Sequence, residues 1–64
     1  MNELMVILEG GHWLYFRTSQ TKADKAFQEF QEALNNAGIN DDNVGYIKAG
    51  LRNSAGNYIE SIRF

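Results

Sequence analysis

The sequence contains no cysteine and no proline, and its 64 residues include only one histidine, His12. Without cysteine the chain cannot be a disulfide-stapled secreted scaffold, and it lacks the ligands for a Cys-coordinated zinc ion or an iron–sulfur cluster. One histidine, without a nucleophile or a third ligand beside it, is a weak basis for an active site. We therefore expect no metal, no cofactor and no enzymatic activity.

Long hydrophobic runs are also missing. The longest, Leu4–Leu8, is too short for a transmembrane helix and lacks the basic flank of a signal peptide. A chain that is 44% hydrophobic, with a net charge of −2, has the composition of one globular domain, residues 1–64. We expect this domain to be cytoplasmic. Because a chain this small buries only about 60% of its unfolded surface, a partner subunit would add stability.

A β-hairpin is predicted at the start of the chain. Leu4–Leu8 and His12–Arg17 are rich in strand-forming residues and flank two glycines, which suit a two-residue loop. That loop would place Leu8 opposite Trp13. Because opposed residues share a face, one face would carry Met5, Ile7, Leu14 and Phe16. The other face would carry Leu4, Val6, Leu8, Trp13, Tyr15 and Arg17.

A helix is predicted over residues 22–37, where apolar residues recur at spacings of three and four. The apolar stripe consists of Ala23, Ala26, Phe27, Phe30, Leu34 and Ala37. Thr21 is the expected N-cap. Gly38 suits the left-handed residue that ends a helix, with Ile39 packing back on Leu34 in a Schellman motif.

A second hairpin is predicted from Val44–Arg52 and Asn57–Phe64, joined by a four-residue turn at residues 53–56. The corresponding register directs Ile47, Leu51, Tyr58, Ile62 and Phe64 toward the helix. It directs Tyr46, Lys48, Gly50, Ile59, Ser61 and Arg63 away from it. Glu60 fits this register poorly, because it falls on the helix side opposite Ala49. A bulge or a lysine such as Lys25 would be needed to accommodate it.

Together these segments predict a two-layer α+β fold in the order β-β-α-β-β, with one helix packed across one face of a four-stranded sheet. The layout resembles the β-grasp arrangement of small immunoglobulin-binding domains, in shape alone. The resemblance implies that the first and last strands lie parallel in the centre of the sheet. Leu4–Leu8 and Tyr58–Phe64 are apolar on both faces, as central strands should be, whereas an edge strand is indicated by Gly45, Lys48, Gly50 and Arg52.

No arrangement of residues in the sequence predicts catalysis. His12 beside Glu9 could form half of an acid–base pair, but we interpret it as an exposed turn residue. The acidic segment Asp41–Asn43 lacks the alternating ligand spacing of a calcium loop and fits a solvated loop. The serines have no base in an evident geometry.

The back of the sheet, away from the helix, is the predicted interaction surface. Trp13 and the tyrosines at 15 and 46 would lie there, whereas aliphatic residues and phenylalanine would face the helix. Three bases and no acid would share this surface, and acids would gather on the helix and the loop after it. The predicted partner-binding residues are Val6, Leu8, Trp13, Tyr15, Arg17, Tyr46, Lys48, Ile59 and Arg63.

Two classes of function fit such a surface. The first is a non-enzymatic protein-interaction module, a regulator or inhibitor that binds a protein partner or a second copy of itself as a homodimer. The alternative is single-stranded nucleic-acid binding, with aromatic rings as a stacking platform. No membrane partner is expected. Exchange of the two sheet faces, or a loop at residues 39–43 that covers the back face, would remove the basis for both.

Overall fold

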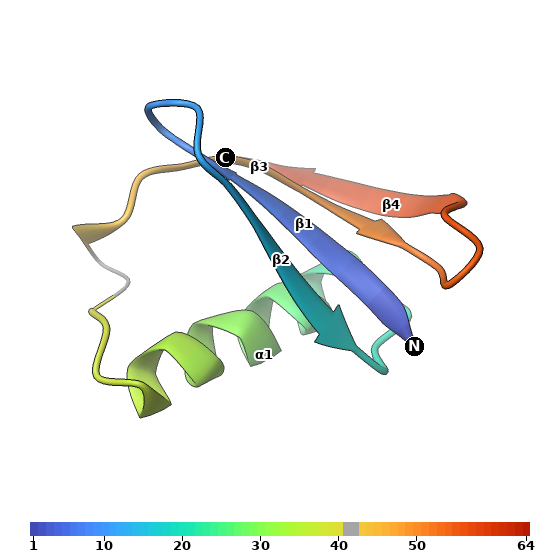
Figure 1. The fold of residues 1–64 in the computed structure, drawn as a ribbon, viewed down its shortest axis with the longest axis horizontal. Helices are drawn as coiled ribbons and strands as arrows, with labels where there is room; N and C mark the ends of the chain where they lie inside the picture. The colour runs from blue at the N-terminus through green and yellow to red at the C-terminus, as the bar shows by residue number, and fades with distance from the viewer. Residues whose placement is uncertain (41–42) are drawn as a thin grey trace.

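The chain folds into one antiparallel sheet with a single helix against one face (Figure 1). The computed structural model describes residues 1–40 and 43–64. In chain order, the elements are β1 (Asn2–Leu8), β2 (Trp13–Thr18), α1 (Ala23–Asn36), β3 (Tyr46–Arg52) and β4 (Tyr58–Arg63). The predicted α+β class, with its β-β-α-β-β order and single helix, is confirmed.

The strand order differs from the β-grasp expectation. It is β2-β1-β3-β4, and every neighbouring pair is antiparallel, so β1 pairs with β3 and not with the last strand. β3 is therefore central and β4 is an edge. The helix-facing side of β3 provides Ala49 and Leu51, which are both fully buried, whereas Ile62 of β4 is only partly buried. Lys48 and Gly50, which indicated an edge strand, belong to the opposite face of β3.

The first hairpin is shifted by one residue from the predicted register. Ile7, not Leu8, is opposite Trp13. The ladder closes where the Leu8 N–H donates to the His12 carbonyl at 2.7 Å, which leaves a three-residue loop. Glu9 belongs to that loop because its N–H donates to the Gly45 carbonyl at 2.9 Å, across to the segment before β3. A one-residue slip turns every side chain of a strand to the other face, so β1 faces the helix with the residues predicted to face away.

The helix follows its predicted stripe. Ala23, Ala26, Phe27 and Phe30 are buried, and Leu34 packs against them. Its end forms the predicted Schellman motif. Gly38 has a φ of 80°, the Ile39 N–H donates to the Leu34 carbonyl at 2.9 Å, and the Gly38 N–H donates to the Asn35 carbonyl at 3.0 Å.

The start of the helix is capped from a distant strand. The predicted N-cap Thr21 is wrong, because Lys22 occupies that position and no side-chain hydrogen bond comes from it. Instead, Glu60 of β4 accepts a hydrogen bond from the Ala23 N–H at 2.5 Å through Oε1. The carboxylate thus lies on the helix side of the sheet, opposite Leu51, and satisfies a free N–H at the positive end of the helix. Glu60 therefore neither turns toward solvent nor needs a lysine such as Lys25 as its partner.

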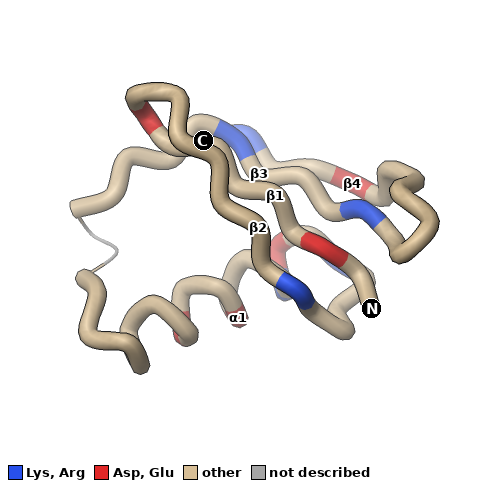
Figure 2. Tube along the Cα trace, viewed as in Figure 1, with Lys and Arg blue, Asp and Glu red and all other residues tan. Residues whose placement is uncertain are grey.

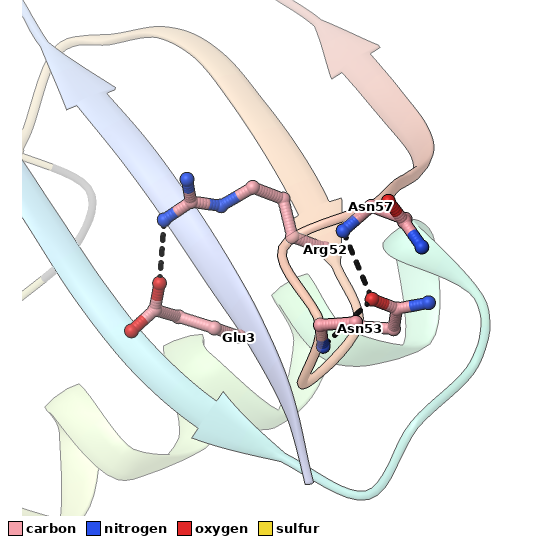
Figure 3. Close-up of polar contacts among 5 residues, drawn as sticks. Glu3, Arg52, Asn53 and Asn57 are labelled. Atoms are coloured by element: carbon pink, nitrogen blue, oxygen red, sulfur yellow. Dashed lines mark hydrogen bonds and ion pairs between the residues drawn. The ribbon is translucent and has the colours of Figure 1, made fainter.

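The second hairpin turns at the predicted place, but its loop is one residue shorter than the predicted four, because the Asn53 N–H donates to the Asn57 carbonyl at 2.9 Å and leaves residues 54–56 as the loop. Asn53 Oδ1 accepts hydrogen bonds from the Ala55 and Asn57 N–H groups (Figure 3). Gly56 has a φ of 83°. Register shifts occur where Leu8 pairs with Tyr46 and where Arg52 pairs with Tyr58. Ile47 and Ile59 are the extra residues, so the alternation of faces is interrupted at both ends of the hairpin.

The core lies between the helix and the central strands, and aromatic rings extend it toward one end of the sheet. The fully buried members from the sheet are Leu4, Val6, Ala49 and Leu51. Phe27 is at the centre of the aromatic group, with ring centroids 5.0 Å from Tyr46, 4.9 Å from Phe64 and 5.8 Å from Phe30. The Phe27 and Tyr46 rings meet edge to face, at 84°, and such packing adds to the apolar burial.

Candidate interaction surface

The face of the sheet opposite the helix, which we call the open face, is defined by the strand register. Residues directly opposite one another share a face, so the pairings arrange its side chains in three rows across β2, β1, β3 and β4. The rows are Arg17, Glu3, Arg52 and Tyr58; Tyr15, Met5, Gly50 and Ser61; and Trp13, Ile7, Lys48 and Arg63. No helix or strand covers this face within residues 1–40 and 43–64.

The aromatic residues of the open face lie along the two edge strands. Trp13 is 53% exposed and Tyr15 is 57% exposed on β2, and Tyr58 is 65% exposed on β4. The Tyr58 hydroxyl is hydrogen-bonded to Ser61 Oγ at 2.9 Å. Exposed tryptophan and tyrosine provide large apolar area together with a polar group, a combination enriched at interfaces.

Positive charge is concentrated on the open face. Four of the six lysine and arginine residues of the chain belong to it, and of the six acids within residues 1–40 and 43–64 only Glu3 does. The acids on the helix, which include Asp24, Glu29 and Glu32, lie on the other side of the molecule (Figure 2). A chain with a negative net charge thus presents one face of positive charge.

The acid of the open face is paired. Glu3 Oε1 lies 2.6 Å from Arg52 Nη2, and both side chains are about two-fifths exposed (Figure 3). Arg17 is directly opposite Glu3 on the other neighbouring strand, so one carboxylate lies between two guanidinium-bearing strands. These three residues, the first two residues of the chain and the 53–56 turn line a depression of about 260 Å³.

Five of the nine predicted partner-binding residues are on the open face: Trp13, Tyr15, Arg17, Lys48 and Arg63. The other four do not lie on it as predicted, because Val6 is fully buried and Leu8, Tyr46 and Ile59 pack against the core. Val6 and Leu8 were misplaced by the one-residue slip of β1.

Bulges account for the other two misplaced residues. At the β1–β3 bulge, Tyr46 pairs with the core-facing Leu8, which turns its ring toward Phe27. Ile59 is itself the extra residue of the β3–β4 bulge. Regular alternation along a strand cannot show where such a residue is inserted.

Sequence reasoning missed the middle of the open face. Met5, Ile7 and Arg52 belong to it, and Glu3 contradicts the prediction that it carries no acid. If the prediction had assumed a three-residue first loop, the two faces of β1 would have been exchanged, and Glu3, Met5 and Ile7 would have been placed correctly. Nothing in the local sequence distinguishes that loop from a two-residue one, because its extra residue, Glu9, is held by a hydrogen bond to the distant Gly45 carbonyl.

The other candidates for chemistry do not form a site. His12 is exposed beside the first loop, and the Glu9 side chain lies against Gly45, where an added Cβ would come within 2.5 Å of Glu9 Cδ. Asp41 and Asp42 of the predicted acidic loop lie outside the described residues. Among the described residues, no three His, Asp or Glu side chains gather closely enough to hold a metal ion. In the same part of the chain, the helix is neither long nor apolar enough to cross a membrane.

Comparisons with known proteins found no relative of this chain. No protein-family model matches the sequence, and neither curated protein sequences nor solved structures gave a significant match. Any proposal about function therefore depends on the geometry and charge of the molecule itself.

Proposed function

We propose that this protein is a small non-enzymatic interaction module, a regulator or inhibitor, whose open face binds an acidic surface of a protein partner. The observation that carries the proposal is the segregation of side chains. Exposed aromatics and four of the six bases share the face that the helix leaves uncovered, and the helix side carries acids. Such a surface offers apolar anchors and charge complementarity together.

Trp13 and Tyr15 are the expected anchors. Both are more than half exposed, and they belong to neighbouring rows of the same strand. Tryptophan, tyrosine and arginine are the residue types that most often dominate binding energy, and Arg17 follows on the same face. Lys48 and Arg63 at the far end of the third row would orient the partner through its carboxylates.

Charge favours an acidic partner over a second open face. Two copies pressed together by their open faces would bring four bases of one against four bases of the other, with one acid on each side. Like charges in apposition cost free energy and slow association. Self-association through the open face, one form of the predicted homodimer, is therefore disfavoured.

The experiment compares two charge reversals that change the net charge equally. Lys48→Glu with Arg63→Glu alters the open face, whereas Lys22→Glu with Lys25→Glu alters the only other bases of the chain, at the start of the helix. Proteins captured by the immobilised native chain are identified by mass spectrometry, and their affinities are then measured directly by titration calorimetry. We expect the open-face variant to lose at least tenfold in affinity and the helix variant to bind as the native protein does. Equal binding by both variants would overturn the proposal.

Single-stranded nucleic-acid binding is the second candidate, because exposed rings and bases also form a stacking platform. The arrangement of rings and charges on the open face supports nucleic-acid binding less than it supports binding of an acidic protein. The two rings on β2 are accompanied by only one base on that strand, and Glu3 lies in the same row as that base. The discriminating measurement is fluorescence anisotropy with an oligo(dT) probe at rising salt. Binding whose affinity falls steeply with salt would favour the nucleic-acid function, since phosphate contacts release counterions.

A further inference from the structure

β2 is an edge strand whose outward backbone groups are not paired within the described part of the chain. In its ladder with β1, Leu8 and His12 form a hydrogen-bonded pair. Because hydrogen-bonded and non-hydrogen-bonded pairs alternate along an antiparallel ladder, the even-numbered residues of β2 direct their N–H and C=O groups toward β1. Trp13, Tyr15 and Arg17 therefore direct theirs away from the sheet.

This free edge lacks most of the devices by which proteins usually prevent strand pairing, since Arg17 is the only charged residue of β2. β2 contains no proline, no lysine, no acid and no bulge. The opposite edge, β4, has two such devices: the bulge at Ile59, and Glu60, whose charge points inward to the helix. The two edges of one sheet thus differ, and β4 is the better protected against pairing.

From this contrast we infer that β2 pairs antiparallel with β2 of a second copy of the chain, about a two-fold axis at Tyr15. The register follows from the hydrogen bonding. Outward-facing residues must pair with one another, and the register that uses all three of them in each strand places Tyr15 opposite its own copy and Trp13 opposite Arg17. Three hydrogen-bonded pairs then supply six backbone hydrogen bonds.

The side chains are complementary in the same register. On the open face, each Trp13 ring lies opposite an Arg17 guanidinium, which is a favourable cation–π arrangement, and two Tyr15 rings meet at the axis. On the helix side, Leu14 pairs with Phe16. Leu14 is 38% exposed, because it lies in the edge strand of the sheet, and the second copy would cover it. Apolar side chains thus flank the free edge on both faces.

The arrangement gives a continuous eight-stranded sheet in which both open faces lie on the same side. Lys48 and Arg63 lie on β3 and β4, away from the paired edges, so their charges do not oppose association. The inference does not rest on the proposed function. The variant carrying Lys48→Glu and Arg63→Glu should dimerise as the native chain does, so failure of one proposal leaves the other testable.

The first test is light-scattering mass across a range of protein concentrations. We expect the native chain to shift from monomer to dimer as its concentration rises. Tyr15→Pro removes one outward N–H that the β1–β2 ladder does not use, and Tyr15→Thr is its matched control, because threonine keeps that N–H. Tyr15→Pro should be monomeric at concentrations where Tyr15→Thr still dimerises. A native chain that stays monomeric throughout would overturn the inference.

Cross-linking tests the register and does not depend on the proline variant folding. Tyr15→Cys places two cysteines opposite each other at about 5.5 Å between Cα atoms, within the range of a disulfide. Arg17→Cys places its two cysteines four residues apart along the paired strands, beyond that range. Since the native chain has no cysteine, any disulfide must be between copies. Tyr15→Cys should oxidise to a dimer at least tenfold faster than Arg17→Cys, and equal rates would refute this register.

Discussion

Replacement of Glu60 should destabilise the protein more than its partly exposed position in an edge strand would indicate. Its carboxylate accepts the hydrogen bond from the Ala23 N–H, and the helix has no side-chain cap of its own. Glu60→Ala removes both the acceptor and the negative charge beside the helix N-terminus. Glu60→Gln keeps an oxygen acceptor and removes only the charge.

The magnitude follows from these two contributions. Loss of a helix cap costs about 0.5–2 kcal/mol, and loss of a negative charge near the N-terminus costs about 0.3–1 kcal/mol. We therefore expect Glu60→Ala to lower the free energy of unfolding by about 2 kcal/mol and Glu60→Gln by less than about 1 kcal/mol. A domain of this size has a total stability of about 3–10 kcal/mol, so the alanine variant loses a large share of it.

Urea unfolding followed by far-ultraviolet circular dichroism measures these differences. A loss of about 2 kcal/mol corresponds to a fall in Tm of roughly 8–16 °C in a domain this small. The matched control is Glu32→Ala, an exposed acid on the same helix, which should change stability by less than about 0.5 kcal/mol. If Glu60→Ala unfolds at the same urea concentration as Glu32→Ala, the cap does not stabilise the fold and the reasoning fails.

Two further predictions concern the sheet and the end of the helix. Trp13→Asp should leave the protein folded because Trp13 is more than half exposed, whereas Val6→Asp should abolish folding because it buries an unpaired charge in the core; circular dichroism distinguishes the two. Gly38→Ala should cost about 1 kcal/mol because the φ of 80° is unfavourable for a residue with a Cβ. Gly50→Ala meets no atom within 4 Å and should be neutral or slightly stabilising in the same unfolding assay; a larger loss at Gly50 than at Gly38 would contradict both assignments.

The helix, the positions of the turns along the chain and the element order could be predicted because each depends on neighbours in sequence. The stripe from Ala23 to Leu34 follows the helical period, and Gly38 provides the conformation that its C-terminus needs. The Asn53 turn likewise depends on a side chain that bonds to its own backbone. Such interactions act over a few residues, so the local sequence is sufficient to specify them.

About half of the candidate surface could be predicted, and the errors have one cause. The β2 side chains at positions 13, 15 and 17 alternate regularly and were placed correctly. The side of the sheet to which the β1 residues, Tyr46 and Ile59 point depends on which residue is left unpaired between two strands. That choice is made by contacts between segments that are distant in sequence, such as the hydrogen bond from Glu9 to Gly45.

The sequence by itself therefore determined the class of fold, the helix with its C-terminal motif, and the presence of an aromatic and basic surface. Only the tertiary structure decided that β1 pairs with β3, that Glu60 caps the helix, and that β2 has a free edge. The physical reason is the range of the interactions. Helical period and turn geometry act between neighbours, whereas strand order and register are set by which distant segments together bury the apolar surface and satisfy the backbone.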